Sequence, residues 1–240
     1  MSAPPTSPKV AIVTGASRGI GAGVAAAFRG AGYAVVGVAR SMPGSDARDL
    51  LAVSGDIAEP ETAQRVVDLA LDRFGRIDTL VNNAGIFISK PFTDYTAADY
   101  AAMIAVNLGG FFHLTQRAIQ PMVDQGVGHI VNVTTSLVDH PRSASPAALT
   151  SLTKGGLDAV ARSLAIEYAG RGVRVNAVSL GVIRTEMHGD PATWASLAAT
   201  HPLGRLGEIS DVVDGILYLE RATFVTGETL HIDGGQAAGH

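Results

Sequence analysis

Seven short runs of apolar, often β-branched residues alternate with longer helix-like stretches, and this alternation constrains the fold more than any other feature. The runs are VAIVTG (10–15), AVVGVA (34–39), LLAVSG (50–55), DTLVNNAG (78–85), HIVNVTT (129–135), VRVNAVS (173–179) and TLHIDGG (229–235). The helix-like stretches lie near 19–29, 60–74, 96–125, 146–169 and 208–220. Strands that alternate with helices favour a parallel sheet, and near-continuous apolar strands favour one covered on both faces. The sequence therefore predicts a seven-stranded parallel α/β sheet with helices on both faces.

The alternation runs without a break, which predicts one domain over residues 9–240 after a Pro/Ser-rich leader at 1–8. The formal net charge is −4 and there is no basic run, so nucleic acid is not an expected partner. The chain has no cysteine, which excludes disulfides and thiolate metal sites, and we predict no metal. The leader lacks the apolar centre of a signal peptide, and no apolar run is long enough to span a membrane. We therefore expect a cytoplasmic protein with no membrane partner.

The glycine-rich turn TGASRGIG follows the first strand and precedes a helix. Ligands of parallel sheets bind beyond the carboxyl ends of the strands. Glycines allow the backbone to approach a pyrophosphate closely, and the start of the next helix offers its positive end to that anion. The turn therefore predicts a dinucleotide site, with the candidate residues Gly15, Ser17, Arg18, Gly19, Ile20 and Gly21.

The residues that follow the next three strands agree with a dinucleotide. Arg40 follows the second strand. In a site for NAD(H), an acidic residue at this position would accept hydrogen bonds from a ribose hydroxyl. Arginine instead suits a 2′-phosphate, so we predict NADP(H), with Arg18 assisting and NAD(H) as the alternative. Asp56 and Ile57 follow the third strand, where they would border an adenine ring. The small residues Asn83, Ala84 and Gly85 follow the fourth.

These motifs, in this order, resemble those of the short-chain dehydrogenase/reductase family from Val10 to about Gly235. The resemblance rests on TGASRGIG, NNAG, AVNLGG, HIVNVTTS, Lys154, VRVNAVSLG with IRT after it, and TGETLHIDGG. It implies a single-domain Rossmann fold, a nicotinamide dinucleotide and a small-molecule substrate. It also implies a homotetramer or homodimer, with the stretches 96–125 and 146–169 at the subunit contact.

The resemblance assigns roles to several residues. Lys154 would contact the nicotinamide ribose and lower the pKa of a tyrosine. Thr185, beside Ile183, would contact the carboxamide, and Asn107 would hold a water that relays protons. The segment 186–207, which contains Trp194 and His201, would cover the substrate.

The chain departs from the family at the proton donor, because Tyr-x-x-x-Lys reads Thr150-Ser-Leu-Thr-Lys154. A tyrosine with a pKa near 10 can be tuned by a lysine into a general acid, whereas an aliphatic hydroxyl cannot. Such help is worth about 10²–10⁴ in rate, or roughly 3–5 kcal/mol. Threonine is also shorter, so we expect a roomier pocket in which Thr150, Ser136 and Lys154 hold a water.

Three further departures are visible. The family's helper serine corresponds to Thr135 when we count forward along the strand, and to Ser136 when we count back from the helix; we slightly favour Ser136. Leu180 stands where the family has a proline. The segment between Arg40 and Asp56 leaves little room for a helix.

Histidine is the side chain best suited to replace the lost acid, because its pKa lies near neutrality. His140, next to Asp139, lies in a loop that should border the substrate pocket, and His188 lies in the cover segment. For each, an ordinary loop residue is the more frequent interpretation. His113 is expected to pack on a helix or at a subunit contact, and the tyrosines at 95, 100, 168 and 218 fall away from the strand ends.

Three functions fit these observations. The favoured one is an NADPH-dependent oxidoreductase that acts on a carbonyl, imine or enone, with His140, water or no donor at the hydride step. The second is a dinucleotide-binding sensor or partner subunit without turnover. The third is a lyase, isomerase or cyclase in which the cofactor is idle.

Overall fold

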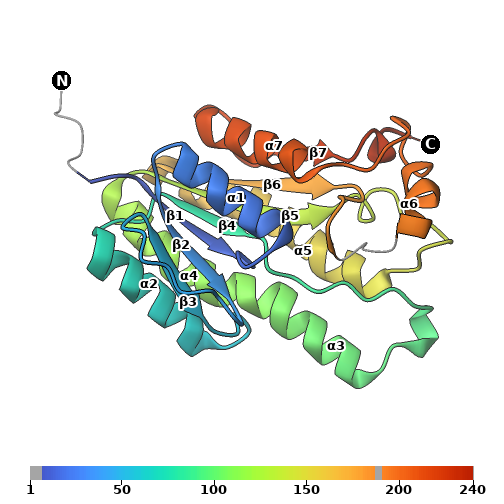
Figure 1. Ribbon diagram of the computed structural model, residues 1–240, viewed down its shortest axis with the longest axis horizontal. Coiled ribbons are helices and arrows are strands. Elements are labelled where there is room, and N and C mark those ends of the chain that lie inside the picture. Colours follow the sequence, from blue (N-terminus) through green and yellow to red (C-terminus); the bar gives the residue numbers. More distant parts are fainter. Residues whose placement is uncertain (1–6, 187–190, 240) are drawn as a thin grey trace.

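The computed structural model describes residues 7–186 and 191–239, and its centre is one seven-stranded sheet (Figure 1). The strands pair in the order β3-β2-β1-β4-β5-β6-β7, and every pairing is parallel. Their bounds are β1 Val10–Thr14, β2 Ala34–Ala39, β3 Leu50–Ser54, β4 Thr79–Asn82, β5 Gly128–Thr135, β6 Val173–Leu180 and β7 Thr229–Ile232. The prediction of a single seven-stranded parallel α/β domain is confirmed.

Helices cover both faces of the sheet (Figure 1). They are α1 Gly19–Gly30, α2 Pro60–Phe74, α3 Ala97–Met103, α4 Gly110–Gln125, α5 Ala148–Tyr168, α6 Pro191–Ala198 and α7 Ile209–Arg221. Buried residues of α1 and α7 pack on one face, and those of α2, α4 and α5 pack on the other. Because the apolar strand residues lie between two helical layers, burial on both faces accounts for the near-continuous apolar runs in the sequence.

The connection between β2 and β3 contains no helix, as its short length predicted. The stretch 96–125, which we expected as one helix, is divided. It starts at a capping box in which Thr96 and Asp99 bind each other's backbone N–H groups. A π-helical turn, Ile104–Gly109, then separates α3 from α4 and contains Asn107. The wider turn changes the direction in which Asn107 projects, and such turns are frequent at functional sites.

The amino ends of the strands, opposite the predicted site, are joined by a buried polar network around Glu220 of α7. The Glu220 carboxylate accepts hydrogen bonds from Tyr33 (2.8 Å), Thr79 (3.0 Å) and His129 Nδ1 (2.7 Å). Asn176 donates to the other ring nitrogen of His129, which assigns the proton to Nδ1 of a neutral imidazole. Burial alone would raise the pKa of Glu220, but the hydrogen bonds from His129, Tyr33 and Thr79 oppose this and lower the pKa below its usual value.

We expect Glu220→Gln to lower the free energy of unfolding by about 2–4 kcal/mol at pH 7, because it removes a buried charge from three donors. The pKa of Glu220 is lowered on folding, so its contribution is present above the unfolded pKa and is lost as the pH falls toward the folded value. Urea denaturation at pH 7 and at acid pH should therefore show the two proteins converging in acid. Glu61→Gln, at an exposed site, is the control, and an equal effect of both changes would contradict this account.

Candidate active site

The loops after β1 and β4 are tied together by Thr14. Its hydroxyl accepts hydrogen bonds from the backbone N–H groups of Asn83 (3.0 Å) and Ala84 (2.9 Å). The Asn83 side chain donates in turn to the Thr14 carbonyl (2.8 Å). These bonds fix the distance between two loops that the sequence separates by almost 70 residues. They form the base of the predicted site.

Two glycines of the first turn are required by close contacts. Gly15 has φ +68°, and a Cβ there would lie 2.8 Å from Asn83 Nδ2. A Cβ on Gly21 would overlap the Gly15 carbonyl oxygen, a backbone atom that cannot move aside. Helix α1 begins immediately after Arg18, and no side chain caps its first N–H groups. Bare backbone donors at a helix start suit a phosphate anion, so the turn fits the predicted pyrophosphate.

A cleft of about 610 Å³ opens at this edge of the sheet. Thirteen of the fifteen residues predicted to bind the cofactor line it: Gly15, Ser17, Arg18, Gly19, Ile20, Gly21, Arg40, Asp56, Ile57, Asn83, Ala84, Gly85 and Thr185. The cleft also includes residues that the sequence motifs did not single out, namely Val38, Ala39, Ser41, Gly55, Ile86, Val106 and Glu186. Most of these directly follow a strand or adjoin a predicted residue, which is the signal that could have found them.

Ile183 is one of the two predicted cofactor residues outside the lining of this cleft. Its side chain is buried against Gly207, and the two residues form a parallel bridge. Ile183 therefore supports the backbone that carries Thr185. Thr185 itself lines the cleft beside Gly19, where a Cβ would lie 3.7 Å from the Thr185 methyl carbon.

Two arginines, Arg18 and Arg40, line the cleft together with the acidic residues Asp56 and Glu186. Arg40 is exposed and forms no hydrogen bond with another described residue, so its guanidinium is available to an anion. Arg18 forms an ion pair with Glu186 (3.3 Å), and both side chains are largely exposed. This pair connects the first turn to the segment after Thr185. Arg40 is consequently the stronger candidate for a 2′-phosphate contact.

Lys154, the other residue outside that lining, lies under the inner end of the cleft. Its ammonium donates to the Val133 carbonyl (2.8 Å), and 8% of the residue is exposed. A Cβ on Gly85 would lie 3.0 Å from Lys154 Nζ and 3.2 Å from Asn107 Oδ1, so all three residues converge at one point. Burial lowers the pKa of Lys154 to about 8, although the charge of Asp158 opposes the shift.

Asn107 acts as a clamp on the loop after β4. Its Oδ1 accepts from the Ile86 N–H (2.8 Å), and its Nδ2 donates to the Ile86 carbonyl (3.1 Å) and to Thr153 Oγ1 (3.1 Å). Both the oxygen and the nitrogen of the Asn107 amide therefore form hydrogen bonds with other protein groups. The predicted water relay at Asn107 stays a prediction, while its positioning of Ile86 is observed.

Thr150 lies one helical turn before Lys154 and is 2% exposed. Its hydroxyl has no hydrogen-bond partner among the described residues. The Thr150 side chain therefore has almost no contact with solvent, and the open space that we predicted beside it is not observed. Ser151 turns away and donates to the Leu137 carbonyl (3.2 Å), as expected for the next position of the helix.

The two helper candidates differ in what their hydroxyls contact. Ser136 is 3% exposed and donates to Gln236 Oε1 (2.7 Å). Gln236 in turn donates to Thr200, so Ser136 anchors the C-terminal segment to the end of β5. Thr135 is partly exposed, and its hydroxyl accepts only a long contact from the Leu137 N–H (3.4 Å). The Thr135 hydroxyl is therefore the more available of the two, and the assignment of the helper role to Ser136 or Thr135 stays a prediction.

His140 is partly buried, and its ring forms no hydrogen bond with a described residue. Asp139 binds His231 (3.1 Å), so it does not orient His140. His188 lies outside the described residues. His113 packs on α4 against Phe112, with ring centroids 5.6 Å apart, in agreement with the expected helix packing.

No tyrosine lines the cleft in the described part of the chain. Tyr95, on the neighbouring loop, donates its hydroxyl to the Ile88 carbonyl (2.8 Å). Tyr33 lies at the opposite end of the strands, bound to Glu220. The phenol lost at position 150 is therefore not supplied from another element.

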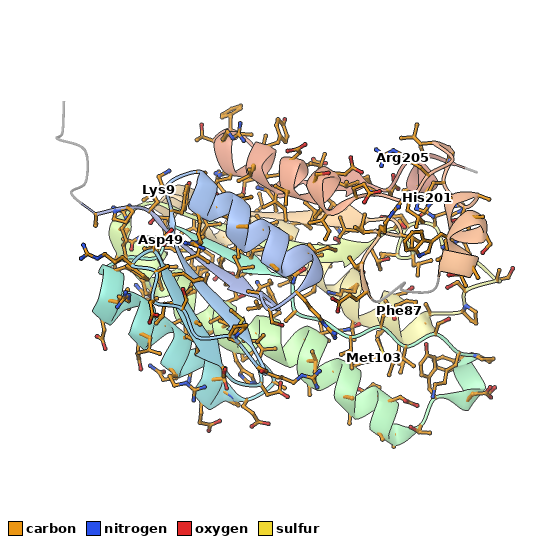
Figure 2. All side chains as sticks on the ribbon, in the orientation of Figure 1. Lys9, Asp49, Phe87, Met103, His201 and Arg205 are labelled. Atoms are coloured by element: carbon orange, nitrogen blue, oxygen red, sulfur yellow. The ribbon has the colours of Figure 1, made fainter. Side chains whose placement is uncertain are left out.

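The predicted cover segment contains α6. Trp194 lies under the Arg184 guanidinium, which is 4.6 Å from the ring centroid. Figure 2 shows His201 beside α6; this ring is 3% exposed and accepts from the Val182 N–H (3.0 Å). His201 is thus part of the packing of this segment.

Residues 7–186 and 191–239 contain no group of three or more metal-binding side chains that could hold an ion. None of their helices is long and apolar enough to cross a membrane.

Known proteins share this architecture over nearly the whole chain. A sequence profile described as "Enoyl-(Acyl carrier protein) reductase" matches residues 15–237. The 3-oxoacyl-[acyl-carrier-protein] reductase FabG of Vibrio cholerae is 36% identical over 238 residues, covering 95% of this chain and 96% of FabG. The 3beta-hydroxysteroid dehydrogenase 1 of Eggerthella lenta is 34% identical over 247 residues, covering 95% of this chain and 93% of the dehydrogenase. The structure of ElxO with NADP bound has a TM-score of 0.90 at 29% identity, covering 97% of this chain and all of ElxO. The chain belongs to the short-chain dehydrogenase/reductase family of oxidoreductases.

Proposed function

We propose that this protein is an NADPH-dependent reductase whose substrate needs no strong acid when the hydride arrives. The single observation that carries the proposal is the convergence of Lys154, Asn107 and Gly85 at a complete dinucleotide cleft, beside a helix position that holds Thr150. Related proteins named as reductases and dehydrogenases, and structures named with NADP bound, support the redox class and the choice of cofactor.

The residues of the cleft fit NADP(H) by their chemistry. The uncapped start of α1 and the glycines before it fit a pyrophosphate, and the unpaired Arg40 fits a 2′-phosphate. When bound, NADPH supplies a hydride. Lys154 would hold the nicotinamide ribose through its ammonium, and Asn107 would keep the Ile86 loop in place beneath it.

The buried Thr150 limits which substrates react quickly. A ketone develops an alkoxide as it accepts hydride, and Thr150 has no phenol with which to protonate that oxygen. An iminium ion already carries positive charge, and a conjugated enone can take its proton later from solvent. For such substrates, holding the hydride donor and the acceptor carbon in the right geometry still increases the rate of reduction. We therefore infer that imines or enones are preferred over simple ketones.

The second candidate function is dinucleotide binding without turnover. The observation that favours it is the burial of Thr150, whose hydroxyl contacts neither solvent nor a described hydrogen-bond partner. It shares the cofactor cleft with the first candidate and differs only in whether hydride leaves the cofactor.

We expect Arg40→Ala to raise the Kd for NADPH by about 10–100-fold and to change the Kd for NADH little. The reason is the loss of charge-assisted hydrogen bonds to a phosphate that NADH lacks. Isothermal titration calorimetry measures both constants. Arg48→Ala, at another exposed arginine of the β2–β3 connection, is the matched control. Equal weakening of NADPH and NADH by Arg40→Ala would contradict the assignment.

We expect stopped-flow absorbance to show faster NADPH oxidation with a cyclic imine or enone than with a matched ketone. Product mass should show a gain of two hydrogens, which separates reduction from lyase, isomerase and cyclase chemistry. No oxidation with any class at high protein concentration, together with tight NADPH binding, would replace this proposal with the non-redox candidate.

We expect Thr150→Tyr to increase ketone reduction by at least ~10-fold, since a restored general acid is typically worth about 10²–10⁴ in rate. Leu152→Tyr adds a phenol to the same helix at a position that is 56% exposed, and serves as the control. Because Thr150 is tightly enclosed, thermal unfolding of both variants checks that the larger ring is accommodated. A well-folded Thr150→Tyr protein with no gain would mean that the lost phenol is not what limits the site.

A further inference from the structure

We propose that a second cavity, next to the cofactor cleft, binds a carboxylate on an otherwise apolar substrate, with Arg142 as its cationic anchor. The inference rests on the proposed function, because it names the substrate class of that same site. The cavity measures about 330 Å³ and lies between the loop after β4 and the loop after β5. Its volume is in the range of small-molecule sites.

The cavity adjoins the cofactor cleft through both of its loops. In the loop after β4, Ile86 lines the cleft and binds Asn107, and the loop continues to Lys90 at the cavity. The loop after β5 leaves Thr135 and reaches the cavity at Leu137. Ser89 holds the two loops together by donating to the Pro146 carbonyl (2.9 Å). A molecule in this cavity therefore lies beside the start of α5, near the catalytic helix turn.

Arg142 is the uncompensated charge in the described lining. Its guanidinium forms no hydrogen bond or ion pair with any described residue. Burial lowers the pKa of this guanidinium, and no carboxylate opposes the shift. A partly buried cation without a partner is costly to the free protein, and an anionic ligand would remove that cost. Arginine also matches a carboxylate with two parallel hydrogen bonds.

The second cation of the lining is already neutralised. Lys90 binds the Asp99 carboxylate (2.8 Å), and its ammonium also lies 5.7 Å from the Tyr95 ring centroid. Because the described lining contains no acidic side chain, the net charge available to a ligand is that of Arg142 alone. One available positive charge favours a monoanion, and hence a carboxylate over a phosphate dianion.

The remaining walls are mostly apolar. Phe92 is 71% exposed at the edge of the cavity, and Leu137 is buried behind it. Ser143 and Ser145, which both follow Arg142 along the loop, add hydroxyl groups to the lining. An aromatic or aliphatic body with one carboxylate matches this distribution. Figure 2 shows Phe87, in the loop after β4, on the side of the molecule that carries α6.

The test compares 3-benzoylpropionic acid with its primary amide by calorimetry, in the presence of saturating NADP⁺. Neither compound can be reduced by NADP⁺, so binding is measured without turnover. We expect the acid to bind about 10–100-fold more tightly than the amide, as for a charge-assisted hydrogen bond. Arg142→Gln should abolish this difference, and Arg142→Lys should restore part of it.

Arg221→Gln changes an exposed arginine at the end of α7 and is the matched control for total charge. The inference is overturned if acid and amide bind equally, if the acid does not bind, or if the difference survives in a folded Arg142→Gln protein. The acid and the amide are also titrated without NADP⁺. A protein that does not bind the cofactor can then be told apart from one whose cavity does not bind the acid. Acid binding that depends on Arg142, in a protein that never oxidises NADPH, would support the cavity and reject the redox proposal.

Discussion

The hydrogen bonds of Thr14 to Asn83 and Ala84 set the geometry on which the rest of the site depends. They place the glycine turn after β1 against the loop after β4, so that a bare backbone surface faces the cleft. The Lys154 ammonium then meets that second loop at Gly85. The predicted phosphate-binding edge and Lys154 are thus positioned against one pair of loops, although α5 lies some 70 residues further along the chain.

The retention of Lys154 is informative because the fold does not need it. A buried amine that hydrogen-bonds a carbonyl costs desolvation, which its lowered pKa reflects. The buried Thr150 hydroxyl adds a cost of about 1–3 kcal/mol as an unsatisfied polar group. Apolar side chains at both positions would suit a pure scaffold better. The combination fits a site that keeps its cofactor contacts and has given up one proton donor, with the stability cost that functional sites often carry.

Much of the fold follows from local sequence patterns. The apolar runs and the glycine turn predict the strands, the start of α1 and most of the residues that line the cleft. These features are local, because a few neighbouring residues decide whether a strand is buried and whether the backbone can come close to a ligand. The division of the stretch 96–125 at a π-helical turn has no comparable local signal. The Ser136 hydroxyl is occupied by Gln236, 100 residues further along the chain, whereas the Thr135 hydroxyl is not. The unpaired charge of Arg142 likewise depends on which loops meet it, and sequence periodicity does not report such long-range contacts.

The central claim is that the bare backbone of the first turn holds the dinucleotide whether or not an acid is present at position 150. The most direct measurement is NADPH fluorescence during titration with wild-type protein and with Gly21→Ala, with circular dichroism to confirm that both are folded. The added methyl group would overlap the Gly15 carbonyl, so we predict saturable binding by the wild type and loss of at least ~100-fold in affinity by the variant. Unchanged binding by Gly21→Ala, or no binding of either nicotinamide coenzyme by the wild type, would contradict the account.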